Sequence, residues 1–292
     1  MKKTKSDGVY FFWSAAILLC MLLAVFALLF TSCAKSNGKP IQSPPTDVED
    51  PSNPSEQDPA VLPPDITGDG GSQAETNAPE TIPPVADGAR LAQTEDMGQE
   101  YIDKFHFFGD STTNGMVTYA KDTVSSSQVW TPASGTLTLN RWSIDALKSH
   151  VDDTERSMAD TFAAVKPEYL LITLGANGVS FMDETSFVTE YTNMVKAIAA
   201  ASPDTKIILN SIYPTCSDYE YKDSISLEKI LAANGWIEKM AGDLGVRFLN
   251  SYEALAGADG YLPKELSNGD GIHLNTDGFN KVFNYIRTHG WQ

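Results

Sequence analysis

The chain has 292 residues, a formal net charge of -17 and three cysteines. This length suits one sizeable domain with further segments, and so negative a chain is a poor partner for nucleic acid, whose backbone is also negative. Only Cys216 lies outside the N-terminal region, so a disulfide within the domain is excluded, and no Cys/His group has the spacing of a zinc site.

The N-terminal region contains an uncharged apolar run, residues 9–30, which follows Lys2, Lys3 and Lys5. As a helix, such a run would span roughly 33 Å, enough for a bilayer core of about 30 Å. The lysines favour a cytoplasmic N-terminus and an exported remainder. A buried core helix is the weaker interpretation, because the run has no polar face.

The end of this run is compatible with two kinds of anchor. Residues 30–33, Phe-Thr-Ser-Cys, resemble a bacterial lipobox, in which Cys33 is lipidated and becomes the mature N-terminus. Phe30 departs from the usual Leu, and the run is longer than a signal core of about 7–15 residues. A permanent membrane helix is the alternative. Under both hypotheses residues 1–33 are a signal or membrane anchor, and the remainder is extracytoplasmic and tethered to the cell membrane.

Residues 34–97 have the composition of a disordered linker rich in Pro and acidic residues. Ten prolines lie between Pro44 and Pro84, and residues 41–100 carry thirteen acidic side chains against a single basic one, Arg90. Such a segment buries too little apolar surface to offset its ordering entropy. We therefore expect an extended spacer without a specific partner.

Residues 98–292 form the predicted folded domain. Near-continuous apolar runs, typical of strands buried on both faces, occupy residues 104–109, 169–175, 206–213 and 246–251. Helical patterns occupy residues 112–121, 154–164, 184–201, 222–243 and 276–288. This alternation predicts an α/β fold with a mainly parallel sheet and helices on both faces. Ligands bind such sheets beyond the carboxyl ends of the strands. We therefore expect functional residues directly after each run.

Ser111 follows the first predicted strand in the triplet Gly-Asp-Ser, residues 109–111, and begins a predicted helix. One interpretation is a helix cap, because Asp, Ser and Thr all accept backbone N–H bonds at a helix start. The other is a nucleophile. The segment is not the G-x-S-x-G elbow of α/β-hydrolases, since Thr113 replaces the last Gly.

A serine nucleophile needs a base, and Asp270 and His273 lie three residues apart in a Gly-rich turn before the last predicted helix. Histidine suits this role because its ordinary pKa is about 6.5. A carboxylate on the other ring nitrogen fixes the tautomer and stabilises the imidazolium. A loop His beside an unrelated turn Asp is the alternative. We expect activity to rise with pH as His273 loses its proton.

Attack on an ester creates an oxyanion, which requires hydrogen-bond donors fixed in advance. The side-chain amide of Asn177, after the second predicted strand, is one candidate, although an Asn-Gly turn explains it equally well. A backbone N–H from Gly135 is the other candidate, because the missing side chain allows close approach.

Other residues with catalytic chemistry lack a suitable context. Asp103 and His106 repeat the three-residue spacing, but His106 lies inside the first predicted strand, about 16 Å from Ser111 along an extended chain. Cys216 has no second His-carboxylate pair to serve it. We interpret His106 as structural and Cys216 as a packing residue.

Taken in this order, the motifs resemble those of the SGNH (GDSL) hydrolase superfamily, over about residues 101–292. The resemblance implies a flavodoxin-like three-layer α/β/α sandwich. It matches Ser111 to the nucleophile, whose N–H also serves the oxyanion hole, Gly135 and Asn177 to the other donors, and Asp270 and His273 to the remaining triad members. One departure is that Gly178 stands where the family commonly has Asp; that Asp is not a reacting group.

These expectations describe an extracytoplasmic serine esterase that requires no cofactor and hydrolyses short acyl esters, O-acetyl groups on carbohydrate being the first hypothesis. Trp130 and Trp142 flank Gly135 and are candidates for stacking on sugar rings, with a role as core aromatics as the favoured alternative. A lipase, thioesterase or acyltransferase with the same triad is one rival function. A catalytically inactive, tethered glycan-binding module is the other.

Overall fold

The computed structural model describes residues 88–292. The predicted anchor, residues 1–33 with the lipidation candidate Cys33, and residues 34–87 of the predicted linker lie outside the described residues. Within the described range, no helix combines the length and the apolar character that a membrane crossing requires.

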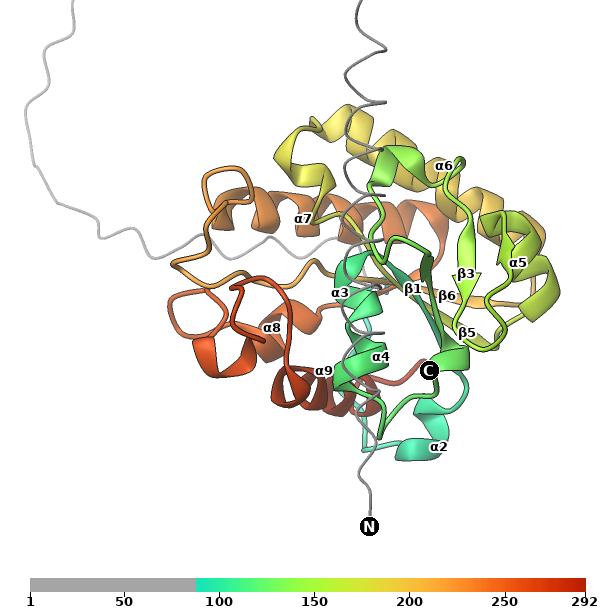
Figure 1. Cartoon of the computed structure of the whole chain (residues 1–292), viewed down its shortest axis with the longest axis horizontal. Helices are drawn as coiled ribbons and strands as arrows, with labels where there is room; N and C mark the ends of the chain where they lie inside the picture. Colours follow the sequence, from blue (N-terminus) through green and yellow to red (C-terminus); the bar gives the residue numbers. More distant parts are fainter. Residues whose placement is uncertain (1–87) are drawn as a thin grey trace, which may run out of the picture. The chain divides into compact units, whose positions relative to one another are not determined.

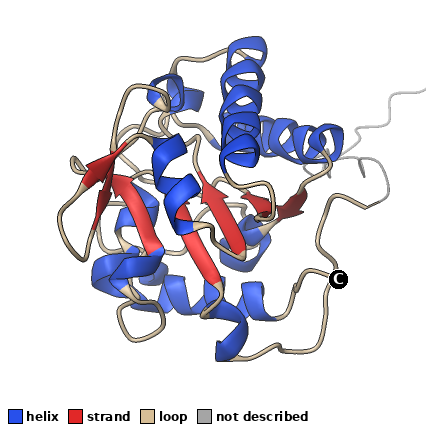
Figure 2. Cartoon of the chain, turned by 90° about the vertical axis from the view of Figure 1, so that its right-hand side faces the viewer, coloured by secondary structure: helices blue, strands red, loops and turns tan. Residues whose placement is uncertain are grey.

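A seven-stranded sheet forms the centre of the fold (Figures 1 and 2), with the order β4-β3-β2-β1-β5-β6-β7. The strands are β1 (Phe105–Gly109), β2 (Val129–Pro132), β3 (Leu147–Ser149), β4 (Glu155–Arg156), β5 (Tyr169–Thr173), β6 (Lys206–Asn210) and β7 (Arg247–Leu249). Strands β2, β1, β5, β6 and β7 are parallel, whereas β3 and β4 extend the sheet beyond β2 in antiparallel pairs. Counted along the chain, the parallel strands have the flavodoxin-like order 2-1-3-4-5.

Helices follow most of the parallel strands. The α-helices are α2 (Gln99–Ile102), α3 (Ser111–Asn114), α4 (Met116–Tyr119), α5 (Met158–Val165), α6 (Glu184–Ala201), α7 (Leu227–Leu244), α8 (Ser251–Leu255) and α9 (Thr276–Arg287). Single 3-10 turns are η1 (Ser126–Gln128), η2 (Leu139–Arg141), η3 (Gly178–Ser180) and η4 (Lys264–Leu266).

The alternation of side chains along the strands creates a separate hydrophobic core on each face of the sheet. On one face, Phe108 and Ile172 pack with residues of α5, α6 and α7. On the other, Phe107 and Leu171 pack with residues of α2, α4, α8 and α9. The predicted three-layer α/β/α arrangement is therefore confirmed, with both faces of the central strands buried.

Four predicted strands and the long predicted helices are confirmed, but the predicted strands end too late. The runs at 169–175, 206–213 and 246–251 continue beyond the last paired residues of β5, β6 and β7. These final residues are still buried, because they enter the core after leaving the ladder; Leu174 and Ile212 are examples. Buried residues are apolar whether or not their backbone is paired, so an apolar run does not show where the strand ends.

The edge of the sheet next to β2 was not predicted. Strand β2 ends in Pro132, and β3 and β4 have only three and two residues, too short for a periodic pattern. Residues 155–156 belong to β4, so the helix predicted over 154–164 begins later, at Met158. The helix predicted over 112–121 is interrupted at Gly115, which ends α3 and begins α4.

The folded domain begins before residue 98, which corrects the predicted linker boundary. Leu91 N–H donates to the Phe248 carbonyl, and Phe248 N–H donates to the Ala89 carbonyl, both at 2.8 Å. Residues 89–91 thus add a short parallel bridge to β7. Arg90 also forms two hydrogen bonds with the Glu238 carboxylate of α7, at 2.8 and 2.5 Å.

We expect Arg90→Ala to destabilise the domain, because it leaves the Glu238 carboxylate without its cation. The Glu238 side chain is only 4% exposed, whereas that of Arg90 is 41% exposed. Removing one partner of a fully buried pair costs about 3–5 kcal/mol. Water reaches Arg90, so we predict a smaller loss, about 2 kcal/mol in the free energy of urea unfolding.

The matched control is Arg90→Ala combined with Glu238→Gln, which removes the stranded charge and should recover part of the loss. An Arg90→Ala protein as stable as the wild type would show that residues 88–97 are not held to the domain in this way.

Candidate active site

Ser111 lies at the carboxyl end of β1, where the strand order of the sheet reverses. The chain leaves β1 toward β2 on one side and later returns to β5 on the other, so the loops after β1 and β5 border the crevice in which such folds bind ligands. Ser111 is the first residue of α3, and Asp110 is the N-cap, whose carboxylate accepts the N–H of Thr112 at 3.0 Å. Asp110 therefore fills the capping role, and the hydroxyl of Ser111 remains available for another partner.

That partner is His273. Its Nε2 lies 2.8 Å from Ser111 Oγ, and its Nδ1 lies 2.6 Å from Asp270 Oδ2. The structure therefore brings together the three residues predicted as a triad, although Ser111 and His273 are 162 positions apart in the chain. The His273 side chain is 28% exposed, so one side of the ring faces solvent.

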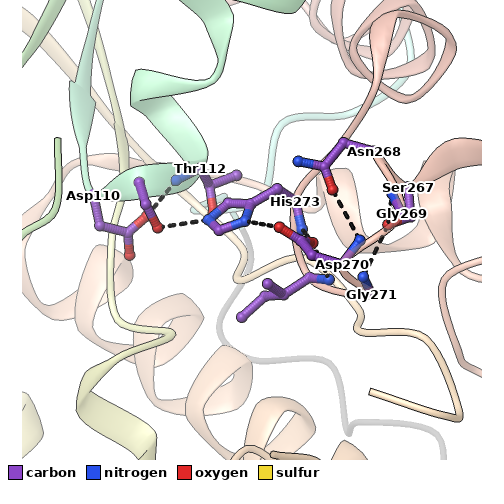
Figure 3. Close-up of polar contacts among 10 residues, drawn as sticks. Asp110, Thr112, Ser267, Asn268, Gly269, Asp270, Gly271 and His273 are labelled. Carbon is purple, nitrogen blue, oxygen red and sulfur yellow. Dashed lines mark hydrogen bonds and ion pairs between the residues drawn. The ribbon is translucent and has the colours of Figure 1, made fainter. Parts of the chain in front are cut away.

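The loop from Ser267 to His273 holds Asp270 by hydrogen bonds within its own residues (Figure 3). Ser267 Oγ accepts the N–H groups of Gly269 and Gly271, at 3.2 and 3.1 Å. The second carboxylate oxygen of Asp270 accepts the N–H groups of Ile272 and His273, both at 2.9 Å. Asp270 thus fixes the backbone before His273 as well as the imidazole ring.

These hydrogen bonds also keep Asp270 ionised. Partial burial opposes the charged form, but the hydrogen bonds from His273 and Ile272 and the nearby imidazole outweigh it and lower the pKa of Asp270. An ionised Asp270 can accept a hydrogen bond from the Nδ1–H group, which leaves Nε2 unprotonated and able to take the proton of Ser111.

The loop after β6 supports the same turn from outside. Cys216 N–H donates to the Gly271 carbonyl at 2.7 Å. Gly271 has a φ of 84°, and a β-carbon there would lie 3.3 Å from Cα of Tyr219. Both the backbone conformation and the close approach require glycine at this position. Enclosure of the turn therefore explains Gly271, whereas at Gly269 only the positive φ of 111° favours glycine.

The carboxyl group of Asp110 is the main feature of the site that the sequence did not single out. It is only 2% exposed, and burial raises its pKa to about 6, although its bonds to Thr112 and the nearby His273 act in the opposite direction. The triplet Gly-Asp-Ser indicated a cap but not that its carboxyl would be enclosed beneath the nucleophile.

Asn177 follows β5 and reaches across the end of β1. Its Nδ2 donates to the Leu137 carbonyl at 3.1 Å and to Thr136 Oγ1 at 3.3 Å, in the loop after β2. Since β1 lies between β2 and β5, this contact passes over the strand end that carries Ser111. Both amide hydrogens have acceptors here, so the role of Asn177 as an oxyanion donor stays a prediction.

The proposed donor role of Gly135 is not supported by the geometry. Its N–H donates to the Pro132 carbonyl at 2.8 Å, so the hydrogen needed for an oxyanion closes a turn instead. Gly135 has a φ of 71°, and a β-carbon would lie 2.8 Å from Nδ2 of Asn114 in α3. The positive φ favours glycine here, and the turn packs against the side chain of Asn114 in the helix that begins at Ser111. The N–H of Ser111 belongs to the first turn of α3, whose donors have no acceptor within the helix.

The two tryptophans next to this turn are not exposed stacking platforms. Trp130 is 7% exposed and belongs to the core between the sheet and α5–α7. Trp142 packs against the same core, and its indole N–H donates to Glu190 at 2.9 Å. Both tryptophans are therefore core aromatics, which was the favoured alternative from the sequence.

The structure places Cys216 in the core and His106 within the sheet, as expected of packing and structural residues. Cys216 is 2% exposed and sits in the core on the α9 face, and burial raises the pKa of its thiol. His106 lies within β1, opposite Leu170 of β5, and burial lowers the pKa of its imidazole. Among residues 88–292, no group of three or more His, Cys, Asp or Glu side chains is placed to hold a metal ion.

The arrangement of Ser111, His273 and Asp270 can perform nucleophilic acyl transfer. A hydroxyl lies within hydrogen-bonding distance of a base, and the base is held by an ionised carboxylate, which is the geometry that activates serine.

Comparison with protein families agrees with this geometry. The family model of the GDSL-like lipase/acylhydrolase family matches residues 107–281, more than half of the chain, a range that includes all three residues. No curated protein matches the sequence.

Several solved structures resemble the chain. A GDSL-like lipase from Bacteroides thetaiotaomicron is 20% identical, with 63% of this chain and 85% of that chain covered and a TM-score of 0.43. An active-site mutant of a family two carbohydrate esterase from Clostridium thermocellum is 17% identical, with coverages of 63% and 62% and a TM-score of 0.42. A carbohydrate esterase of family 3 from Talaromyces cellulolyticus is 18% identical, with coverages of 63% and 94% and a TM-score of 0.40. At this level of similarity, the substrates of those proteins say nothing about this chain.

Asp270→Asn should retain the fold and lose most of the activity. The amide oxygen can still accept the N–H groups of Ile272 and His273, but the amide nitrogen cannot accept the proton on His273 Nδ1. The imidazole is then left in the wrong tautomer, and we expect kcat for ester hydrolysis to fall about 10⁴-fold. Asp277→Asn, an exposed carboxylate in the first turn of α9, is the control and should keep wild-type activity. A value of kcat near that of the wild type in Asp270→Asn would contradict the assignment.

The buried carboxyl of Asp110 predicts a pH dependence of stability. Its pKa is about 6 in the folded protein against an ordinary value of 3.8, so between these pH values the folded state holds a proton that the unfolded chain has released. Stability therefore falls as pH rises through this window, by on the order of 3 kcal/mol. Asp110→Asn keeps the oxygen that caps Thr112 and does not titrate, so this loss should disappear in urea unfolding at pH 4 and pH 7.

Asp183→Asn is the matched control, because Asp183 caps α6 through the N–H of Ser186 and that hydrogen bond lowers its pKa. Asp183 thus titrates below this window, and its substitution should leave the change between pH 4 and pH 7 as in the wild type. An unaltered pH dependence in Asp110→Asn would show that Asp110 is not held as described.

Proposed function

The chain belongs to the GDSL-like lipase/acylhydrolase family, and we propose that this ester-hydrolysing serine hydrolase is an extracytoplasmic enzyme that removes short acyl groups, O-acetyl groups above all, from carbohydrate. The observation that carries the proposal is the continuous pair of hydrogen bonds from Ser111 Oγ to His273 and from His273 to Asp270.

The first half-reaction transfers the acyl group to the enzyme. Ser111 Oγ attacks the carbonyl carbon of the ester as its proton passes to His273 Nε2, and the resulting imidazolium is stabilised by Asp270. The tetrahedral intermediate then collapses, the bond between the carbonyl carbon and the alcohol oxygen breaks, and His273 returns the proton to the departing alcohol. The alcohol leaves, and Ser111 remains acylated.

The second half-reaction restores the enzyme. His273 Nε2 takes a proton from water, whose oxygen attacks the acyl carbon. Collapse of the second tetrahedral intermediate breaks the bond to Ser111 Oγ, which regains a proton from His273, and the carboxylic acid leaves. The N–H of Ser111 and the amide of Asn177 are the proposed donors to the oxyanion in both steps. Asn177 is then required to release the longer of its two hydrogen bonds, the 3.3 Å bond to Thr136.

Polar side chains around the crevice support a small acyl group on a hydroxylated alcohol. The loops after β2 and β5 bring the hydroxyl of Thr136 and the amide of Asn177 together over the end of β1, and Asn114 lies behind them in α3, hydrogen-bonded to Thr131. Sugar hydroxyls can pair with the remaining donor and acceptor capacity of these groups, whereas a long acyl chain would cover that capacity without pairing with it. The net charge of -17 also favours an uncharged substrate over an anionic lipid surface.

The proposed location follows from the N-terminal sequence. Three lysines before the apolar run of residues 9–30 favour export of the remainder. Cys33 provides a lipidation site under the lipobox hypothesis, and residues 9–30 provide the anchor under the alternative. The long linker would then give the enzyme reach toward substrates away from the membrane.

We predict that the purified full-length chain hydrolyses p-nitrophenyl acetate and butyrate faster than p-nitrophenyl palmitate. Ser111→Ala should lower kcat for the short esters by about 10⁴–10⁶-fold, because the nucleophile of a working triad is removed. Ser224→Ala, at an exposed serine outside the site, is the matched control and should behave like the wild type.

Two results would contradict this function. Equal rates for Ser111→Ala and the wild type would exclude Ser111 as the nucleophile. A strong preference for palmitate would retain the triad but replace the short-chain esterase with a lipase.

A further inference from the structure

A groove of about 600 Å³ lies beside the carboxyl end of β2, apart from the triad. The register pairs Pro132 of β2 with Leu147 of β3, and Leu147 with Arg156 of β4. Ala146, which precedes Leu147, therefore lies at the same edge of the sheet as the active-site loops, whereas Glu155 pairs with Lys148, one residue further from that edge. The groove is lined by Pro132, Ser134, Thr136, Arg141, Ala146 and Glu155, among others.

The turn over residues 133–136 lines this groove and also contacts Asn177 and the helix that begins at Ser111. Thr136 lines the groove, and its Oγ1 accepts the hydrogen bond from Asn177. Gly135 packs against Asn114 of α3, the helix that begins at Ser111. A substrate in the groove therefore contacts a turn that itself packs against the helix that begins at Ser111.

The size of the groove suits the alcohol part of a substrate and not its acyl part. Sites for small organic ligands typically have volumes of about 300–1,000 Å³, and the groove falls within that range. An acetyl group needs far less space. The groove is therefore large enough for sugar units attached to the acylated one.

The side chains in the groove match an uncharged, hydroxylated ligand. Arg141 binds both carboxylate oxygens of Asp145, at 2.8 and 2.5 Å, and both residues line the groove. Arg141 keeps further N–H donors and Asp145 keeps further lone pairs beyond this contact, and these can bond to sugar hydroxyls. Since Arg141 balances Asp145, Glu155 gives this part of the lining a negative charge, which disfavours acidic polysaccharides. Ile144, which is 69% exposed, adds an apolar surface for a sugar ring.

We propose that this groove is a subsite for the saccharide units next to the acylated sugar, and that it selects neutral oligosaccharides. The proposal rests on the proposed esterase function and adds where the carbohydrate binds. The turn over residues 133–136 then serves both sites, because one side contacts Asn177 and the other borders the groove.

The test compares two substrates in variants that change only the groove. Ala146→Trp places a large side chain in the groove, and Arg141→Met removes its cation. We measure kcat/KM for O-acetylated xylooligosaccharides and for p-nitrophenyl acetate, which has no sugar. In both variants the ratio of the first value to the second should fall at least about tenfold, equivalent to about 1.4 kcal/mol. Ala163→Trp, at an exposed position of α5, is the matched control and should keep the wild-type ratio.

A second readout measures binding without turnover. Deacetylated xylooligosaccharides should inhibit hydrolysis of p-nitrophenyl acetate by the wild type and by Ala163→Trp, and should inhibit Arg141→Met at least about tenfold more weakly. If Ala146→Trp fails to fold, this comparison with Arg141→Met decides the question.

The outcomes separate the two proposals. An unchanged substrate ratio and unchanged inhibition in the groove variants, with the wild type still deacetylating the oligosaccharides, would overturn the subsite and leave the proposed function standing. A wild type that hydrolyses p-nitrophenyl acetate but not the oligosaccharides would overturn the carbohydrate substrate and the subsite together.

Discussion

The hydrogen bond between Ser111 Oγ and His273 Nε2 is the contact on which the proposed chemistry depends. It joins residues 162 positions apart, and neither residue has catalytic value without the other. The parallel sheet makes this contact possible by placing the end of β1 and the loop before α9 at one edge. The core on one face of the sheet then fixes these two elements relative to each other, since Phe107 of β1 and Phe279 and Phe283 of α9 all belong to it.

Hydrogen bonds to the backbone, as well as those between side chains, hold the loop from Ser267 to His273 in place. Asp270 uses one carboxylate oxygen for the imidazole and the other for two backbone N–H groups. One residue thereby sets both the position of His273 and the orientation of its ring. Gly271 permits the turn to lie against Tyr219, so the loop after β6 limits its movement. A side chain at residue 271 would disturb the triad without contacting a substrate.

A division of roles between adjacent residues explains why Ser111 is free to react. Asp110 provides the cap of α3, and the serine hydroxyl is directed to the histidine instead of to its own helix. Burial of the Asp110 carboxyl, which raises its pKa to about 6, costs stability at the residue next to the nucleophile. Strain or unfavourable burial of this kind is often concentrated at functional sites.

The sequence was sufficient for the features that depend on local pattern. Buried strands are continuous apolar runs, so the α/β class was predictable, and Ser111 follows the end of the first run. Asp270 and His273 lie in a Gly-rich turn whose role the local pattern left open, and the family resemblance assigned them to the triad. Features that depend on distant pairing were not predictable, such as β3, β4 and the pairing of residues 89–91 with β7. Gly135 was predicted to donate its N–H to the oxyanion, but the direction of that N–H depends on a turn to Pro132 that composition does not reveal.

The most direct test of the central claim is labelling of the full-length chain with a fluorophosphonate, followed by mapping of the modified residue by peptide mass spectrometry. The reagent bonds to an activated serine, so labelling reports the state of the nucleophile without requiring the natural substrate. We predict modification of Ser111, no modification of the site in Ser111→Ala, and much slower labelling in His273→Ala. Labelling of a different residue, or equal labelling of the wild type and His273→Ala, would contradict this prediction.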